Sequence, residues 1–316
     1  MSFPLISEEL EHFEKELALE LKSSVEFIEA IGDDLVTAGG KRLRPSLAFL
    51  AAKLLEANRE QAMQVALSVE LLHSASLLHD DLIDDADTRR GHEAAFRRYG
   101  NVVSVMSGDY MLARVLGILA RSGSSEFTQL MSDTAAQICE GEVLQFQMAT
   151  LETYSFENYF KVIEGKTAVL FAAALEGVAI LKGVDSGKRE ALRQFGMSYG
   201  RAFQMRDDYL DLMGEASQLG KPVGGDLREG KATYPVLVLF DANIKGAYDV
   251  LKRHARAEGD IEQMIALVKE HSADKETRSQ IAAEVERALA SLTVFADNPA
   301  KSHLGHLVQQ ELKRIS

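Results

Sequence analysis

Cysteine, proline and tryptophan are scarce in this 316-residue chain, and each shortage limits the classes of protein it can belong to. Cys139 is the single cysteine, so an intrachain disulfide and a cysteine metal cluster are both excluded. So little cysteine fits a reducing compartment. Only five prolines occur, which leaves long stretches without a strong helix breaker. Tryptophan is absent. We therefore expect a cytoplasmic protein with long helices.

Positive charge is also in short supply. Lys and Arg number 35 against 48 Asp and Glu, which gives a net charge of −13. This balance argues against a broad nucleic-acid-binding face, which needs cations to neutralise phosphates, and against adsorption to an anionic membrane. It still allows a local basic pocket for an anionic substrate.

Neither a secretory signal nor a membrane span is expected. Residues 1–17 are acidic and amphipathic and lack the basic and apolar regions of a secretory signal. The longest apolar stretches fall short of the ~20 residues that a membrane span requires. With 46% hydrophobic and 26% charged residues, the composition is that of a soluble globular protein.

Helical periodicity recurs along the chain and predicts an all-α fold. Residues 61–79 are apolar around most of the helix circumference, which is typical of a central helix. The same pattern continues at 102–120, 126–149, 156–182 and 188–213. Dense charge on one face predicts outer helices at 247–270 and 274–294. The short apolar run 236–240 is ambiguous, and its context favours helix.

Two acidic clusters lie on opposite sides of mid-chain. Neither half of the chain is complete without the other, so we expect one domain over residues 1–316. The first cluster reads His79-Asp-Asp-Leu-Ile-Asp-Asp and ends an apolar helix. Asp80 and Asp84 are four residues apart and share a helix face, where like charges repel. Taken alone, this cluster could be a solvated helix end.

The second cluster repeats the pattern. In Gln204-Met-Arg-Asp-Asp-Tyr-Leu-Asp, Asp207 and Asp211 share a helix face after an apolar, small-residue segment. Two D-D-x-x-D motifs are far less probable by chance than one. Carboxylates without cysteine or paired histidine favour a hard ion such as Mg²⁺, which completes its shell with water and phosphate oxygens. The two motifs therefore predict Mg²⁺ ions that bind a diphosphate.

Basic residues stand in glycine-rich contexts suited to phosphoryl oxygens. These short motifs are Gly-Gly-Lys-Arg-Leu-Arg-Pro at 39–45, Thr-Arg-Arg-Gly at 88–91, Gly-Lys-Thr at 165–167, Gly-Lys-Pro at 220–222 and Gly-Lys at 230–231. Each is a weak signal alone. Lys166-Thr167 is not a Walker A motif, because the upstream glycine pattern is missing.

In this order and spacing, the motifs resemble those of the trans-type isoprenyl diphosphate synthase family. Members are all-α helical bundles around a deep central cavity and are usually homodimers. They catalyse the Mg²⁺-dependent, head-to-tail condensation of an allylic diphosphate with isopentenyl diphosphate. The resemblance covers positions 39 to 231, and the flanking segments carry no motif.

The resemblance implies roles for individual residues. About three Mg²⁺ ions would be bound, two by Asp80 and Asp84 and one by Asp207, supported by Asp81, Asp208 and Asp211. The allylic diphosphate would be bound by Arg89, Lys166, Lys221 and Lys231. Isopentenyl diphosphate would be bound by Lys41, Arg44, His73 and Arg90. Thr167 and Gln204 would face the reacting allylic carbon, and the glycine-rich segment 214–231 would act as a lid.

Product length is predicted from the residues before the first motif. Ala75 and Ser76 lie five and four residues before Asp80. A helical turn rises about 5.4 Å, roughly one extended isoprene unit, so successive turns can act as a ruler. Short-chain family members have aromatic rings at one of these positions, whereas both residues here are small. We therefore expect an all-trans product of C30 to C50, centred on C40.

Other functions fit the sequence less well. A short-chain synthase with a C15–C20 product would need a block that the sequence does not reveal. A class I terpene cyclase needs no second diphosphate site and has an aromatic-rich cavity, yet aromatics are only 7% here. A non-catalytic synthase subunit is expected to lose its aspartates, and both clusters are present.

Overall fold

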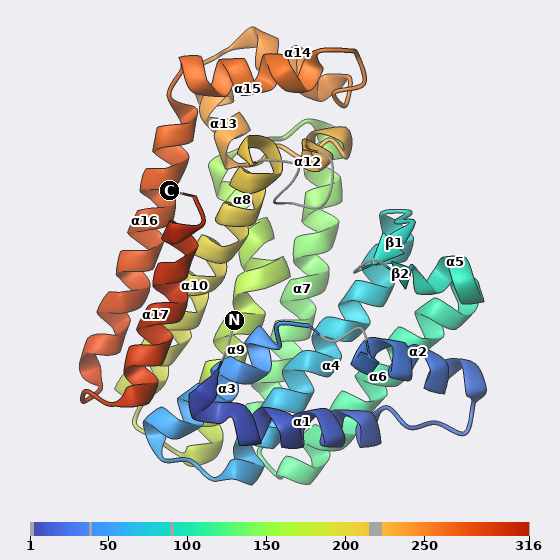
Figure 1. Cartoon of the computed structure of the whole chain (residues 1–316), viewed down its shortest axis with the longest axis vertical. Helices are drawn as coiled ribbons and strands as arrows, with labels where there is room; N and C mark the ends of the chain where they lie inside the picture. Colours follow the sequence, from blue (N-terminus) through green and yellow to red (C-terminus); the bar gives the residue numbers. More distant parts are fainter. Residues whose placement is uncertain (1–2, 38–39, 90–91, 215–222, 316) are drawn as a thin grey trace. The chain divides into compact units, whose positions relative to one another are not determined.

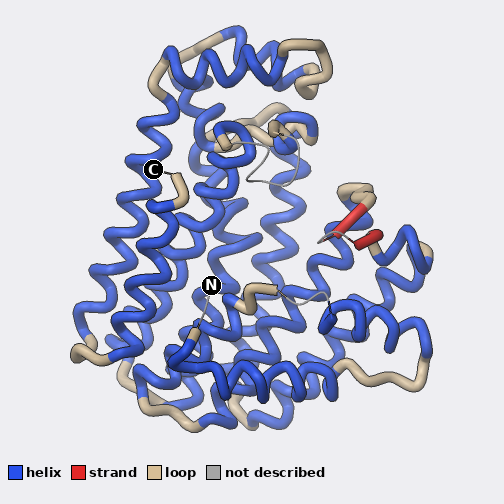
Figure 2. The backbone as a smooth tube through the Cα atoms, viewed as in Figure 1, coloured by secondary structure: helices blue, strands red, loops and turns tan. Residues whose placement is uncertain are grey.

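The structure is a computed structural model that describes residues 3–37, 40–89, 92–214 and 223–315. Within these ranges nearly every segment is helical (Figure 2). The strands in the described residues are β1 (Thr88–Arg89) and β2 (His92–Glu93), which pair antiparallel as a minimal hairpin. The predicted all-α class is confirmed.

The chain forms two compact units, each built from separate segments. Unit 1 contains residues 1–135, 173–193 and 295–304, and unit 2 contains 136–172, 194–294 and 305–316. Most of the boundaries between these segments fall inside long helices. The organisation as one domain stays a prediction.

Unit 1 is arranged around the helix α4 (Arg59–Ile83) (Figure 1). Asn58 begins α4 by accepting a hydrogen bond from the Glu60 amide at 2.8 Å, as a good N-cap does. Val65, Val69 and Leu71 are fully buried, which fits the prediction of a central helix. The other elements of its N-terminal part are η1 (Pro4–Ile6), α1 (Ser7–Glu20), α2 (Glu26–Thr37), α3 (Leu43–Leu55), α5 (Ala95–Tyr99) and α6 (Asn101–Ser122).

Helix α6 differs from the sequence expectation. Among the described residues it is the one helix long and apolar enough, by length and composition, to cross a membrane. The expectation that no apolar stretch reaches that length is therefore wrong. In the qualifying window 39% of the residues are buried. Core helices of soluble proteins pass the same test, so it assigns no location by itself.

Unit 2 contains the second half of α7 (Ser125–Leu151) and most of α10 (Ser186–Met213). Helices α10, α16 (Ala273–Ser291) and α17 (Pro299–Lys313) run side by side, and α14 (Lys245–Lys252) and α15 (Asp260–Glu270) lie across one end (Figure 1). The remaining elements of unit 2 are α8 (Phe156–Ile163), η2 (Glu164–Ala168), α12 (Gly225–Arg228), α13 (Tyr234–Asp241) and η3 (Leu292–Val294). Helix α9 (Val169–Lys182) begins in unit 2 and lies mostly in unit 1. The ambiguous run 236–240 lies in α13 and is helical.

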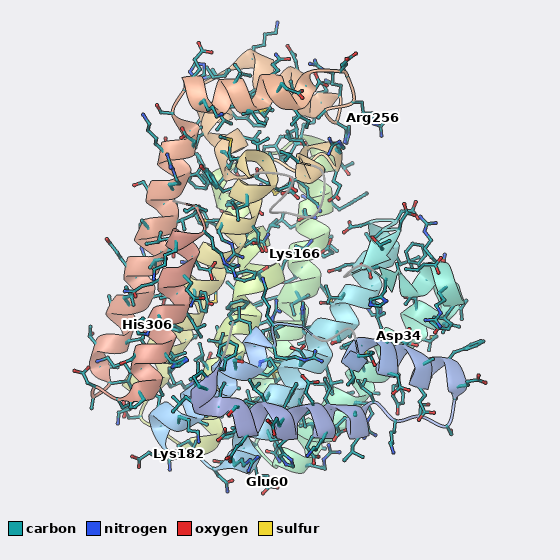
Figure 3. The ribbon with its side chains drawn as sticks, viewed as in Figure 1. Asp34, Glu60, Lys166, Lys182, Arg256 and His306 are labelled. Atoms are coloured by element: carbon teal, nitrogen blue, oxygen red, sulfur yellow. The ribbon has the colours of Figure 1, made fainter. Side chains whose placement is uncertain are left out.

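The helix predicted at 247–270 is divided in two. His254 and Ala255 have φ values of 56° and 48°, in the left-handed region that ends a helix. Asp260 then begins α15 and accepts hydrogen bonds from the Ala257 amide and the Arg253 Nε, both at 2.9 Å. Arg256 lies in this outer loop, whereas Lys166 lies among the helices of the unit (Figure 3).

Candidate active site

The first acidic motif ends helix α4. The Asp84 amide donates to the Asp80 carbonyl at 2.8 Å, so the two residues lie one turn apart. Asp84 is exposed and Asp80 is half-buried, whereas Asp81 is only 3% exposed. The motif thus offers two aspartates on one helix face and buries the third.

Helix α6 fixes the position of His79, the residue before this motif. The imidazole Nε2 lies 3.2 Å from the Val105 carbonyl and 3.6 Å from Asp109. Gly108 leaves the space for the ring, because a Cβ there would lie 2.3 Å from Nε2. The end of α4 is therefore tied to α6 on the side of His79.

Arg42 was missed as a functional candidate, although it lies between Lys41 and Arg44. It is 7% exposed, and its φ of 43° is left-handed. Its Nη1 donates to Glu70 at 2.8 Å, and its Nε and Nη2 donate to Glu14 at 2.7 and 3.0 Å. Burial lowers the pKa of Arg42, but Glu14 and Glu70 more than restore it, so the pKa stays above its ordinary value. Arg42 thus anchors the start of α3, between the predicted substrate-binding cations Lys41 and Arg44.

Some of the basic residues predicted to bind diphosphate lie outside the residues that the structure describes. Arg90 and Lys221 lie outside the described residues, as does the part of the predicted lid at 215–222. For Arg89 the structure gives only the backbone, in β1. His73 lies in α4, where its carbonyl accepts a hydrogen bond from the Ser76 hydroxyl at 2.9 Å. Ala75, on the same helix, is fully buried.

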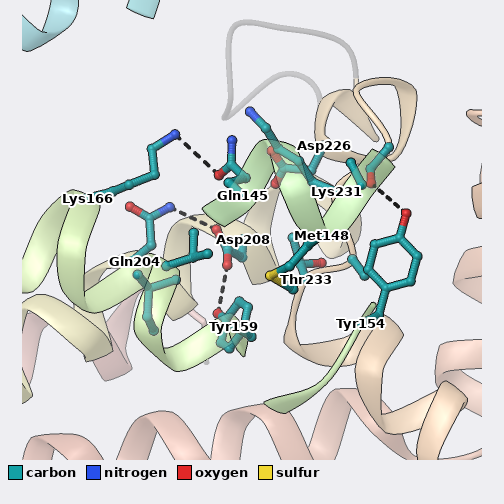
Figure 4. A pocket seen from close by; sticks show the side chains of 15 residues that line it. Gln145, Met148, Tyr154, Tyr159, Lys166, Gln204, Asp208, Asp226, Lys231 and Thr233 are labelled. Carbon is teal, nitrogen blue, oxygen red and sulfur yellow. Dashed lines mark hydrogen bonds between the residues drawn. The ribbon is translucent and has the colours of Figure 1, made fainter. Parts of the chain in front are cut away.

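Unit 2 contains a cavity of about 130 Å³ lined by charged, polar and apolar side chains (Figure 4). A chain of hydrogen bonds runs along its wall. Thr167 donates to the Gln204 Oε1 at 2.8 Å, and the Gln204 Nε2 donates to the Asp208 Oδ1 at 2.8 Å. The Tyr159 hydroxyl donates to the Asp208 Oδ2 at 2.7 Å. Both predicted carbon-facing residues, Thr167 and Gln204, thus belong to one network with Asp208.

A π-helical turn places Lys166 on this cavity. Within η2 the ammonium of Lys166 lies 3.2 Å from the Gln145 Oε1 and 2.5 Å from the Glu142 carboxylate. Glycines allow η2 to approach α7 closely, since a Cβ on Gly165 would lie 2.6 Å from the Gln137 carbonyl. Single π-helical turns of this kind are frequent at functional sites.

The second acidic motif also separates one exposed aspartate from two buried ones. The Asp207 side chain is 47% exposed. Asp208 and Asp211 are 7% and 3% exposed. Asp211 accepts a hydrogen bond from the Asp226 amide at 3.0 Å, and Lys231 on the following loop pairs with Glu229 and lines the cavity.

Burial perturbs the ionisation of Asp208. Loss of hydration raises its pKa to about 6, although hydrogen bonds from Gln204 and Tyr159 favour the ionised form. A carboxyl group so engaged serves better to orient its neighbours than to coordinate a cation alone.

The residues fit a hard divalent cation that shares its shell with a substrate. Among the described residues, no cluster of three or more His, Cys, Asp or Glu side chains could hold a metal ion by itself. Each motif instead offers exposed or half-exposed carboxylate oxygens. This is the donor set expected for Mg²⁺, which takes one or two carboxylates and completes its shell with phosphate oxygens and water.

The described residues provide two aspartate-rich helix ends, a lysine-lined cavity and basic residues at the start of α3. These features are those expected of an all-α enzyme that acts on prenyl diphosphates. The chain belongs to the polyprenyl synthetase family, whose model matches residues 25–268. It is a trans-prenyltransferase of the polyprenyl diphosphate synthase type.

Similar proteins cover almost the whole chain. It is 35% identical to the all-trans-nonaprenyl-diphosphate synthase (geranyl-diphosphate specific) of Rhodobacter capsulatus, over 93% of this chain and 91% of that protein. It is also 35% identical to the octaprenyl diphosphate synthase of Escherichia coli, over 93% and 92%. The crystal structure of a polyprenyl synthase from Caulobacter crescentus, complexed with calcium and isoprenyl diphosphate, matches with a TM-score of 0.91 and 34% identity, over 99% and 96%.

Proposed function

We propose that the protein elongates an allylic diphosphate by successive head-to-tail condensation with isopentenyl diphosphate and releases an all-trans polyprenyl diphosphate of C30 to C50, about C40. The observation that carries this proposal is the hydrogen-bonded network of Thr167, Gln204 and Asp208, of which Gln204 and Asp208 line the same cavity as Lys166. The nonaprenyl and octaprenyl synthases named above support the long product.

The reaction begins when the allylic C–O bond breaks and its electron pair leaves with the diphosphate. The alkene of isopentenyl diphosphate then forms a bond to the allylic cation. A proton leaves the adjacent carbon, and the departed diphosphate accepts it, so no protein base is required. Product and inorganic diphosphate balance the two substrates.

Lys166 and Lys231 supply positive charge from the protein. Both ammonium groups line the cavity and pair with carboxylates, Lys166 with Glu142 and Lys231 with Glu229. A diphosphate with up to three negative charges competes well for such cations. Arg89 and Lys221 complete this allylic site in the proposal, and Lys41, Arg44, His73 and Arg90 bind isopentenyl diphosphate.

Mg²⁺ is the proposed cofactor, in about three ions. Asp80, Asp84 and Asp207 would hold it, and Asp81, Asp208 and Asp211 would support them from buried positions. When bound, Mg²⁺ would offset the charge that develops on the diphosphate. The protein's part is to fix the carboxylates and to keep water from the cation.

Thr167 and Gln204 present oxygens to the allylic carbon in this proposal. The Gln204 amide is held at both ends, by the Thr167 hydroxyl and by Asp208. A side chain fixed in this way can place its oxygen dipole against a developing cation without first reorganising.

The exposed apolar side chains of α6 support a homodimer. Val102, Met106 and Leu116 are 76%, 54% and 66% exposed. Their spacing places them on one broad side of the helix. A second copy would remove this surface from water. In sedimentation velocity, the dimer should dissociate in Met106→Glu and persist in Glu140→Gln, which alters an exposed polar position.

Product analysis tests the proposed reaction. Purified protein is incubated with Mg²⁺, labelled isopentenyl diphosphate and a C10, C15 or C20 allylic diphosphate, and polyprenol lengths are then resolved. A product of C30 or longer is expected. A stop at C15 or C20 contradicts the length assigned from Ala75 and Ser76, and absent incorporation contradicts the reaction itself. The exposed Cys139 supports a reducing location such as the cytoplasm, which fractionation tests.

A further inference from the structure

A buried ion pair connects the C-terminal helix to the second acidic motif. Arg206 is 1% exposed and Glu311, on α17, is fully buried. The Arg206 Nη1 donates to the Glu311 Oε2, and the guanidinium lies 4.4 Å from the centre of the Phe203 ring. Such a contact between a cation and a ring further restricts the guanidinium. Arg206 therefore has a fixed position inside unit 2.

The same guanidinium binds the exposed aspartate of the motif. The Arg206 Nε donates to the Asp207 Oδ1 at 3.0 Å, and Nη2 donates to the same oxygen. Both bonds fall on Oδ1, so the carboxylate is held in one orientation and Oδ2 takes part in neither contact. Asp207 is 47% exposed, so it can reach a ligand while its other side is anchored.

The charges of the three groups explain why Glu311 matters. One cation is shared between two carboxylates, which leaves a net charge of −1. Without Glu311, the full charge of Arg206 would act on Asp207 and compete with an incoming cation. A buried arginine cannot relieve this by losing its proton.

We propose that Glu311 is a positioning residue for the second acidic motif: through Arg206 it orients the Asp207 carboxylate and keeps it available to a divalent cation bound with diphosphate. This inference rests on the proposed role of Asp207 in cation binding. It assigns a function to a residue of the C-terminal helix, which lies outside every motif of the sequence.

Binding and kinetics test the proposal on the full-length protein. Titration calorimetry measures Mg²⁺ binding in the presence of inorganic diphosphate for wild type, Glu311→Gln and Asp207→Asn. Loss of a group that orients a metal ligand typically weakens binding 10- to 100-fold. Glu311→Gln should therefore raise the Mg²⁺ concentration for half-saturation at least ~10-fold. Its kcat at saturating Mg²⁺ should stay within a few-fold of wild type, while KM for the allylic diphosphate rises at low Mg²⁺.

Glu176→Gln is the matched control. Glu176 is 5% exposed and accepts a hydrogen bond from the Arg189 Nε at 2.8 Å, and Arg189 is not one of the proposed site residues. It should lose stability without changing Mg²⁺ binding. Should Glu311→Gln fail to fold, the double variant Arg206→Met/Glu311→Met removes both charges, a replacement that buried ion pairs often tolerate. This variant should also need more Mg²⁺, because it no longer orients Asp207.

The outcomes separate the two hypotheses. If Asp207→Asn weakens Mg²⁺ binding and the folded Glu311 or double variant binds like wild type, the positioning role is refuted and the proposed function stands. If wild type shows no Mg²⁺ binding with diphosphate, or if Asp207→Asn does not alter it, the metal role of Asp207 fails and the inference fails with it.

Discussion

Replacing Arg42 separates two opposing effects that the structure places on one residue. Its φ of 43° and ψ of 39° are left-handed, which costs an L-residue about 1–2 kcal/mol. Arg42→Gly should recover that cost. It would also leave Glu70, at 4% exposure, buried without its cation, a loss of about 3–5 kcal/mol. The net effect should be a destabilisation of about 1–4 kcal/mol.

The assay combines thermal unfolding with substrate kinetics. At about 2 °C per kcal/mol for a chain of this length, the Tm should fall by about 2–8 °C. KM for isopentenyl diphosphate should rise more than KM for the allylic substrate, because Lys41 and Arg44 flank the anchored start of α3. Glu70→Gln added to Arg42→Gly should restore part of the stability, since it removes the unpaired charge.

Glu56→Gly is the control for the backbone effect. Glu56 is exposed and also left-handed, with a φ of 51°. This variant should be stabilised by about 1 kcal/mol. A wild-type Tm for Arg42→Gly would refute the buried ion pair as a source of stability. A lower Tm with unchanged KM for isopentenyl diphosphate would refute the role of Arg42 in positioning Lys41 and Arg44.

Three further changes test other parts of the structure. Gly108→Ala should move the His79 ring away from the Val105 carbonyl. The lost hydrogen bond destabilises the fold by about 1 kcal/mol and the higher helix propensity of alanine stabilises it by about the same amount. The Tm should therefore hardly change, whereas activity at limiting Mg²⁺ should fall. Unchanged activity would refute the link to the first motif. Ala75→Phe should shorten the product to C15–C20 by polyprenol analysis, and an unchanged length would refute the ruler. In Mg²⁺-free buffer, the pKa of Asp208, about 6 against 3.8 in the unfolded chain, means that the folded state binds the extra proton. Unfolding free energy should therefore fall as pH rises from 4 to 6, and Asp208→Asn should abolish this slope in denaturant titrations.

Local pattern was enough to predict most helices. The central helix expected at 61–79 is α4, and the amphipathic segment 274–294 is α16 with its final turn. Periodicity works here because each helix buries one face or most of its circumference. It failed at 247–270, where two left-handed residues interrupt a charged segment without a proline or a strong change in hydrophobicity.

The acidic motifs could be found from sequence because their residues are adjacent, but their supporting contacts could not. Arg42 is 28 residues from both Glu14 and Glu70, and Arg206 is 105 residues from Glu311. Nothing in the local pattern marks such partners. Burial also divides the aspartates of each motif, and burial depends on packing rather than on spacing. The roles proposed for Asp81, Asp208 and Asp211 are compatible with their burial and stay predictions.

The π-helical turn at Glu164–Ala168 makes the site depend on the number of residues in the chain. A π turn holds one residue more than the α-helical turn it replaces. Deleting one residue there would leave the segment between α8 and α9 as a regular α-helix and preserve every other side chain. Because the α-helical turn makes the same rotation with one residue fewer, α8 and α9 would keep their relative orientation, whereas the side chains that remain within the turn would change their angular positions about the helix axis. Lys166 would then no longer lie on the same cavity wall as Gln204 and Tyr159, and Thr167 would lose its hydrogen bond to Gln204. The chemistry of this cavity is thus encoded in a count of residues as much as in their identity.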